Sequence, residues 1–193
     1  MKTFEELGLS REFVSVLERA RIATPLEIQE KTIPFVLAGR DVIGGSATGS
    51  GKTLAFVSGI IENLKKNGSV QALILTPTRE LAEQVADSIK KFSQHKKLNV
   101  LSVYGGVNIQ NQIRRLQNTD VVVGTPGRIL DHLSRRTLNL SNVRFLVLDE
   151  VDRMFDMGFQ IDVKKILSQC PKERQTMLFS ATISSGIDNL AKI

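Results

Sequence analysis

The sequence is poor in the residues that build disulfides, metal clusters and aromatic platforms. Its 193 residues include one cysteine, Cys170, and two histidines, His95 and His132. One cysteine excludes an internal disulfide framework, and no Cys/His cluster has the spacing of a zinc site. With no tryptophan and one tyrosine, stacking of nucleic-acid bases on aromatic side chains is expected to be minor. No stretch reads as a signal peptide or a membrane span, so we expect a cytoplasmic protein in a reducing compartment.

The composition that remains is that of a globular, basic protein. Hydrophobic residues make up 41% of the chain, which supports a real core and one large domain. The formal net charge is +6 and the sequence pI is near 9.6. This balance favours a polyanionic partner such as nucleic acid.

Apolar runs alternate with helical patterns along most of the chain. The expected strands are Asp41–Gly45, Ala72–Thr76, Val100–Tyr104, Val121–Gly124, Phe145–Asp149 and Thr176–Ser180. The expected helices between them are Leu54–Lys66, Arg79–Lys91, Ile109–Gln117, Arg128–Leu133 and Phe159–Ser168. Continuous apolar strands separated by helices predict an α/β fold, with a mostly parallel sheet covered by helices on both faces. Ligands of such folds bind at the carboxyl ends of the strands.

The two ends of the chain carry helical signals of their own. Residues 4–37 have a helical pattern that breaks near Thr24-Pro25. The chain stops within residues 186–193, a segment that resembles the start of a helix. We therefore expect one domain over residues 1–193, with 1–38 as its N-terminal helical region, and a longer parent protein.

Residues 46–53, Ser-Ala-Thr-Gly-Ser-Gly-Lys-Thr, join an expected strand to an expected helix. Backbone N–H groups of Gly49–Gly51 and the helix N-terminus suit phosphate oxygens. Lys52 would reach the β and γ phosphates, and the Thr53 hydroxyl would bind Mg²⁺. A dinucleotide-binding loop is disfavoured because its third glycine would fall on Leu54. The pattern predicts a nucleoside triphosphate site, although Ser46 replaces the usual first glycine.

Asp149 and Glu150 follow the apolar run Leu146–Leu148. A buried strand in this position would fix two acids where a metal and an attacking water meet. Asp149 would hold Mg²⁺ through water, and Glu150 would orient or deprotonate the attacking water. The alternative is an acidic surface turn or helix cap. The phosphate loop upstream favours the catalytic interpretation.

Seven ordered motifs together resemble one family. They are Pro25-Leu26-Glu27-Ile28-Gln29, Ser46–Thr53, Pro77-Thr78-Arg79-Glu80-Leu81, Gly105-Gly106, Thr125-Pro126-Gly127-Arg128, Asp149-Glu150-Val151-Asp152 and Ser180-Ala181-Thr182. From Phe4 to its last residues the chain resembles the N-terminal, RecA-like domain of DEAD-box RNA helicases. Val151 stands where the family's name motif has alanine, and it leaves all three acids in place.

The resemblance implies an ATP site with Mg²⁺. Lys52, Asp149 and Glu150 would be catalytic, and Thr53 and Asp149 would hold the metal. Gln29 would hydrogen-bond adenine, since an amide offers donor and acceptor side by side. Phe4 would stack near the base or pack in the core, and Thr24 would cap the second helix or line the base pocket. The implied nucleotide-binding residues are Phe4, Thr24, Gln29, Ser46, Ala47, Thr48, Gly49, Ser50, Gly51, Lys52 and Thr53.

The resemblance also implies contacts with the RNA backbone that do not depend on base sequence. The matching positions are Pro77, Thr78, Arg79, Gly105, Gly106, Thr125, Pro126, Gly127 and Arg128. Arginines can fork onto phosphates, and glycines allow close approach of the backbone. Read without the resemblance, the same residues equally fit strand-to-helix turns. Asp152, Ser180 and Thr182 match the positions that couple ATP state to RNA handling.

The function implied is that of the N-terminal part of an ATP-dependent RNA helicase. A second RecA-like domain in the parent protein would supply arginines to the transition state, so the isolated chain would be nearly inactive. One alternative is another P-loop ATPase, such as a DNA helicase or translocase, which Gln29 and the Thr125–Arg128 motif disfavour. The other is a non-catalytic module that uses nucleotide only to hold RNA, which intact Lys52, Asp149 and Glu150 disfavour.

Overall fold

The computed structural model describes residues 1–45, 47 and 49–193, so the predictions for Ser46 and Thr48 lie outside the described residues. The described residues form a six-stranded parallel sheet with the order β1-β6-β5-β2-β4-β3. The strands are β1 (Val42–Gly45), β2 (Ala72–Leu75), β3 (Val100–Val103), β4 (Val121–Gly124), β5 (Phe145–Leu148) and β6 (Gln175–Ser180). This confirms the predicted fold class.

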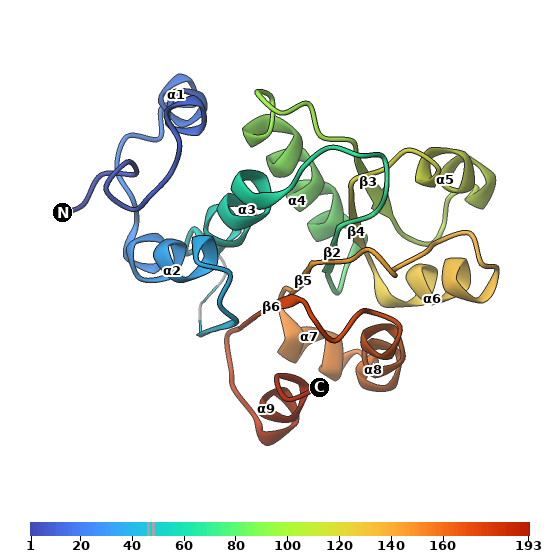
Figure 1. Ribbon diagram of the computed structural model, residues 1–193. Coiled ribbons are helices and arrows are strands. Elements are labelled where there is room, and N and C mark those ends of the chain that lie inside the picture. The colour runs from blue at the N-terminus through green and yellow to red at the C-terminus, as the bar shows by residue number, and fades with distance from the viewer. Residues whose placement is uncertain (46, 48) are drawn as a thin grey trace.

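Helices cover both faces of this sheet (Figure 1). On one face lie α1 (Arg11–Arg19), α2 (Glu27–Leu37), α3 (Lys52–Asn63) and α4 (Arg79–Phe92). The other core includes residues of α5 (Ile109–Leu116), α6 (Pro126–Ser134), α7 (Val151–Asp156), α8 (Gln160–Ser168) and α9 (Ser185–Leu190). Among the described residues, no helix is both long and apolar enough to cross a membrane.

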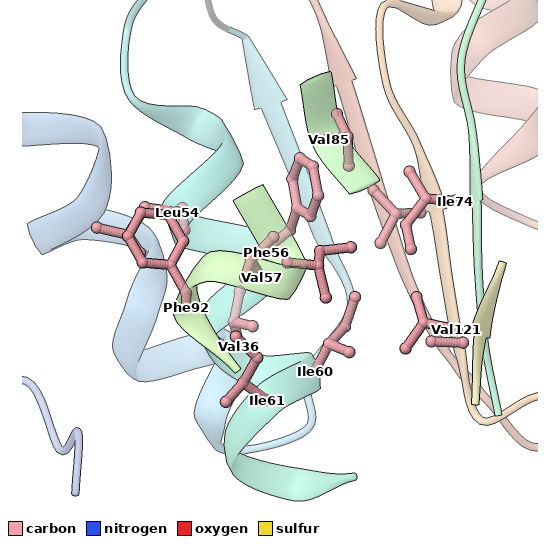
Figure 2. Packing of buried hydrophobic residues seen from close by; sticks show 14 of the residues in the cluster. Val36, Leu54, Phe56, Val57, Ile60, Ile61, Ile74, Val85, Phe92 and Val121 are labelled. Carbon is pink, nitrogen blue, oxygen red and sulfur yellow. The ribbon is translucent and has the colours of Figure 1, made fainter. Parts of the chain in front are cut away.

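The central strands are apolar throughout because each face supports a separate core. In β2, Ala72 and Ile74 point into the first core, while Leu73 and Leu75 point into the second. Figure 2 shows Ile74 in the first core, beside α3 residues such as Phe56 and Ile60. All four β2 residues are fully buried. The resulting rigid sheet fixes the positions of the loops that follow its strands.

Two helices begin earlier than their apolar patterns predict. Gly51 is the N-cap of α3 with a left-handed backbone (φ 85°), so the helix begins at Lys52 rather than Leu54. Pro126 occupies the first turn of α6, where its missing N–H costs nothing. The N-terminus of α6 therefore lies directly after β4, and that of α3 follows the glycine loop after β1. At both, N–H groups of the first turn can face an anion.

The N-terminal region folds as two separate helices, as the predicted break near Thr24-Pro25 suggested. The N-cap of α2 is Leu26, so the suggestion that Thr24 caps this helix is wrong. The Gln29 side chain takes over the capping role, because its Oε1 accepts a hydrogen bond from Leu26 N at 2.9 Å. Helix α7 is absent from the predicted helices, because the sequence shows a helical pattern only over Phe159–Ser168, the region of α8.

Candidate active site and nucleic-acid interface

The carboxyl ends of β1, β5 and β6 bring one group of polar residues together. These strands are neighbours, and Gly45 at the end of β1 lies opposite Ser180 at the end of β6. Asp149 follows β5 immediately, and Lys52 begins the helix after the β1 loop. Residues that are far apart in the sequence thus meet at one edge of the sheet.

Lys52 and Asp149 form a buried ion pair at this edge. Lys52 Nζ lies 3.0 Å from Asp149 Oδ1 and 4.0 Å from Glu150 Oε1. The Lys52 side chain is 7% exposed, and that of Asp149 is fully buried. Burial raises the pKa of the Asp149 carboxyl, and the Lys52 ammonium acts against this rise. A buried pair of this kind is weak evidence for stability, which points to a functional reason for placing both charges here.

The same carboxylate suits a hard cation. Asp149 Oδ2 is buried and has no hydrogen-bond partner among the described residues. Thr53 lies in the first turn of α3, next to Lys52. Mg²⁺ usually takes one or two protein oxygens together with water and substrate phosphates. The described residues contain no cluster of three or more His, Cys, Asp or Glu suited to a metal, and this chemistry does not need one. The residues present fit Mg²⁺ bound with a nucleotide.

Glu150 has an unusual backbone for its residue type. Its φ and ψ are both 52°, in the left-handed region, and it serves as the N-cap of α7. This conformation costs a non-glycine residue about 1–2 kcal/mol. Its side chain is 14% exposed, and its Oε2 lies 3.5 Å from Arg153 Nη1. The strained backbone places one accessible carboxylate beside the buried Lys52–Asp149 pair.

Gln29 attaches helix α2 to the phosphate loop. Its Nε2 donates to Gly51 O at 3.0 Å while its Oε1 accepts from Leu26 N. A Cβ on Gly51 would lie 2.6 Å from Leu26 Cδ1 and 2.8 Å from Gln29 Nε2, so this contact requires glycine. One N–H and one acceptor position of the amide remain for another partner. Recognition of adenine by Gln29 stays a prediction.

A hollow of about 590 Å³ lies beside the loop, and Phe4 is not among its lining residues. Phe4 is 2% exposed and belongs to the first core, which favours the packing alternative over stacking. Thr24 is exposed in the bend before α2. The hollow is lined by Leu26, Glu27, Ile28, Lys31, Gly45, Ala47, Gly49 and Ser50.

Asp152 is hydrogen-bonded to the segment that follows β6. Its Oδ2 accepts from Thr182 Oγ1 at 3.2 Å and from Thr182 N at 3.3 Å. Ser180 Oγ accepts from Asp152 N at 3.3 Å and donates to Thr182 O at 2.6 Å. These bonds connect the start of α7 to the chain after β6, beside the charged pair.

A second group of polar residues follows β2, β3 and β4. Thr78 is the N-cap of α4, and its hydroxyl accepts from Leu81 N at 3.3 Å. Gly105 and Gly106 are exposed, and an added Cβ at either would have no atom within 4 Å. Thr125 is the N-cap of α6. Donors and open backbone therefore share the same edge of the sheet as the charged site.

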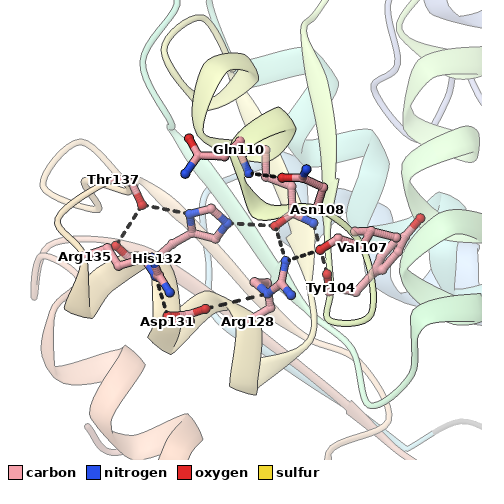
Figure 3. A network of polar contacts seen from close by, with 10 residues as sticks. Tyr104, Val107, Asn108, Gln110, Arg128, Asp131, His132, Arg135 and Thr137 are labelled. Atoms are coloured by element: carbon pink, nitrogen blue, oxygen red, sulfur yellow. Dashed lines mark hydrogen bonds and ion pairs between the residues drawn. The ribbon is translucent and has the colours of Figure 1, made fainter.

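Two arginines in this second group differ in the exposure of their side chains and in the contacts that hold them. The Arg79 side chain is 49% exposed, and its guanidinium lies over the Tyr104 ring, 4.6 Å from the centroid. The Arg128 side chain is only 14% exposed. Its Nη1 donates to Val107 O at 3.1 Å and to Gln112 Oε1 at 3.2 Å (Figure 3). Part of the Arg128 fork is thus already bound by the protein itself.

Comparisons with known proteins assign this chain to one family. The family model described as DEAD/DEAH box helicase matches residues 26–190. The chain belongs to the DEAD/DEAH box helicase family. It is 50% identical over 194 residues to the DEAD-box ATP-dependent RNA helicase CshA of Geobacillus kaustophilus, covering 100% of this chain and 42% of that protein. It is 47% identical to the RNA helicase CrhR of Synechocystis, covering 97% of this chain and 38% of that protein.

A solved DEAD-box structure confirms the RecA-like fold class. The crystal structure of a DEAD box protein from the hyperthermophile Methanococcus jannaschii superposes with a TM-score of 0.95 at 47% identity. It covers 98% of this chain and 53% of that chain. The chain thus spans about half or less of the length of these relatives.

Sequence reasoning missed the contacts that Tyr104 and Glu83 make with Arg79. Tyr104 carries Arg79 on its ring, and its hydroxyl donates to Glu83, which also pairs with Arg79 at 3.7 Å. The hydrogen bond to Glu83 raises the pKa of Tyr104. The sequence did offer one indication of this role, because Tyr104 is the only tyrosine and directly precedes Gly105-Gly106. The ring supports an arginine in this structure.

Proposed function

We propose that this chain is the N-terminal ATP- and RNA-binding part of an ATP-dependent RNA helicase. The observation that carries the proposal is the buried Lys52–Asp149 pair, 3.0 Å apart, at the start of a helix that follows a glycine loop. The relatives named as ATP-dependent RNA helicases support it. Hydrolysis would be coupled to unwinding or remodelling of RNA in the longer parent protein.

Each residue at the charged edge has a role in this chemistry. Lys52 binds the β and γ phosphates, and backbone N–H groups at the start of α3 add to that binding. Thr53 and Asp149 would hold Mg²⁺, which would neutralise charge on the phosphates. Glu150 orients the attacking water and accepts its proton. Gln29 and the hollow beside it bind the adenine base.

The second group of residues binds single-stranded RNA by its backbone. Arg79 and Arg128 contact phosphates, while threonine hydroxyls and exposed glycines allow close contact with sugar and phosphate oxygens. Asp152, Ser180 and Thr182 transmit the state of the nucleotide to this surface. A second RecA-like domain of the parent completes both sites, and the domain of residues 1–193 contributes half of the RNA surface.

Calorimetric titration of this chain with Mg-ATP tests the nucleotide site. Lys52→Ala removes a charge-assisted contact, so the affinity should fall by about 10- to 100-fold. Lys164→Ala, an exposed lysine of α8, is the matched control and should bind as the unmodified chain does. Equal affinity in the two variants would overturn the proposal.

A further inference from the structure

We propose that Gln112 is a positioning residue for RNA binding, and that it acts together with His132. The two hold Arg128 and the loop around Gly105 and Gly106 in the arrangement that receives an RNA phosphate. The inference rests on the proposed function, because Arg128 is taken there as a phosphate contact. Neither Gln112 nor His132 belongs to the motifs that indicated the family.

Both residues are buried although both are polar. Gln112 is 5% exposed and His132 is fully buried, on the neighbouring helices α5 and α6. Gln112 Oε1 lies 2.8 Å from His132 Nε2 and 3.2 Å from Arg128 Nη1, and its Nε2 donates to Tyr104 O at 3.0 Å (Figure 3). Buried polar groups are tolerated when their hydrogen bonds are made, as they are here. A fully hydrogen-bonded network also holds its side chains in a single arrangement.

The network also fixes the protonation of His132. Gln112 Oε1 can only accept, so His132 Nε2 carries a proton, while Nδ1 lies 2.8 Å from Thr137 Oγ1, which also lies 3.2 Å from His132 O. Burial lowers the pKa of His132, and the charge of Arg128 lowers it further. A neutral imidazole with its proton on Nε2 is therefore a fixed donor to Gln112.

As a result, some of the hydrogen-bond donors of Arg128 are occupied by protein groups and others are not. Its two Nη1 hydrogens are used by Val107 O and Gln112 Oε1, and its Nε lies 3.9 Å from Asp131 Oδ2. Among the described residues no hydrogen bond uses Nη2, which is the end left for a phosphate oxygen. Because the side chain is held before RNA arrives, less rotamer entropy is lost on binding.

The same contacts hold both ends of the glycine loop. Tyr104 O accepts from Gln112 Nε2, and Val107 O accepts from Arg128 Nη1. Between these two carbonyls lie Gly105 and Gly106, the second with a φ of 84°. Gln112 thus sets the position of the loop and of Arg128 relative to one another, which are the two elements proposed to meet the RNA backbone.

RNA affinity of this chain, measured by fluorescence anisotropy with an unstructured single strand, tests the role of Gln112. Gln112→Met keeps the length of the side chain and removes its three hydrogen bonds, and we expect about tenfold weaker binding with unchanged affinity for ATP. Gln110→Met is the matched control, because Gln110 is exposed on the same helix and only its backbone N–H bonds to another side chain, Asn108. It should bind RNA as the unmodified chain does.

A double-mutant cycle separates positioning from general stability. If Gln112 acts partly through Arg128, then adding Gln112→Met to Arg128→Ala should reduce the affinity less than Gln112→Met does in the unmodified chain. Two variants of His132 give a second route if Gln112→Met folds poorly. His132→Gln can keep an N–H near the Nε2 position and should retain affinity, whereas His132→Leu should lose it.

The outcomes distinguish this inference from the proposed function. If the unmodified chain binds no RNA, or Arg128→Ala binds as well as the unmodified chain, the proposed RNA surface is wrong and the inference fails with it. If Arg128→Ala weakens binding but Gln112→Met and His132→Leu do not, only the positioning role is overturned. Additive losses in the cycle would also overturn it.

Discussion

Glu150 and Asp149 are adjacent carboxylates in different surroundings. Asp149 is fully buried against Lys52, whereas Glu150 keeps 14% of its side chain exposed. Water can reach Glu150 more readily than Asp149, because Asp149 is enclosed by the end of β5 and by Lys52. Difference of environment is a common way for two neighbouring acids to take different roles. Here it favours Asp149 as the metal ligand and Glu150 as the base.

The Glu150→Gln variant of the longer parent protein should bind ATP normally and hydrolyse it about 10²–10⁴ times more slowly. The amide is nearly isosteric, and the Glu150 side chain makes no cap hydrogen bond to α7 that would be lost, but the amide cannot accept a proton from water. The rate of phosphate release at saturating RNA and ATP measures this loss. Glu173→Gln, an exposed acid between α8 and β6, serves as the control. Near-normal turnover in Glu150→Gln would place the base elsewhere.

Packing between helices also depends on a glycine within α3. A Cβ on Gly59 would lie 2.1 Å from Val36 Cγ1 of α2 and 3.3 Å from Val36 O. The two helices approach this closely because residue 59 has no side chain. Since α2 carries Gln29 and α3 begins at Lys52, this contact helps set the distance between these two residues.

Gly59→Val should destabilise the fold by about 1–3 kcal/mol through overpacking. For a chain of this size, that corresponds to a fall in Tm of roughly 2–4 °C for each kcal/mol. Thermal unfolding followed by circular dichroism gives the value. As a comparison, Gly127→Ala in α6 meets no atom within 4 Å and should leave Tm unchanged or slightly higher. A Tm for Gly59→Val equal to that of the unmodified chain would contradict this account of α2–α3 packing.

The strands could be predicted from the sequence to within one residue at each end, and helix starts less well. Apolar runs such as Leu146–Leu148 are decisive because both sheet faces are covered. The starts of α3 and α6 depend on the backbone of Gly51 and on Pro126, which apolar periodicity does not register. Helix α7 is short and follows β5 through the left-handed Glu150, so no separate pattern marked it.

The candidate site was predictable where its residues lie in local motifs. Lys52, Asp149 and Glu150 each sit at the end of a strand or the start of a helix, so the pattern indicated their meeting. The contacts of Gln112 and His132 were not predictable, because they depend on which faces of α5 and α6 oppose one another. Periodicity identifies a buried face but does not identify the partner across it.

At the scale of the whole molecule, this chain carries one side of each proposed site. Under the proposed function, the described residues near Lys52 provide binding groups and a base. Arginines from a second domain are the remaining requirement of this chemistry, and such arginines contribute about 10³–10⁵ in rate in related phosphoryl transfer.

The isolated chain should therefore bind Mg-ATP yet hydrolyse it about 10³-fold or more slowly than the RNA-bound parent protein. Steady-state ATPase assays with and without single-stranded RNA measure both rates, and single-stranded DNA of the same length is the control for the RNA requirement. Turnover by the isolated chain that equals that of the parent would show that the second domain adds nothing to the reaction.

The sheet order has a consequence for how this domain is made in the cell. Strand β1, which leads into the phosphate loop, lies at an edge of the sheet and pairs with β6. Thr176 N also donates to Asp41 Oδ1, 135 residues earlier in the chain. During translation, β1 leaves the ribosome early, and nearly the whole domain must be synthesised before its partner strand is available. The glycine loop that follows β1 therefore lacks the neighbouring strand that supports it until β6 has been synthesised.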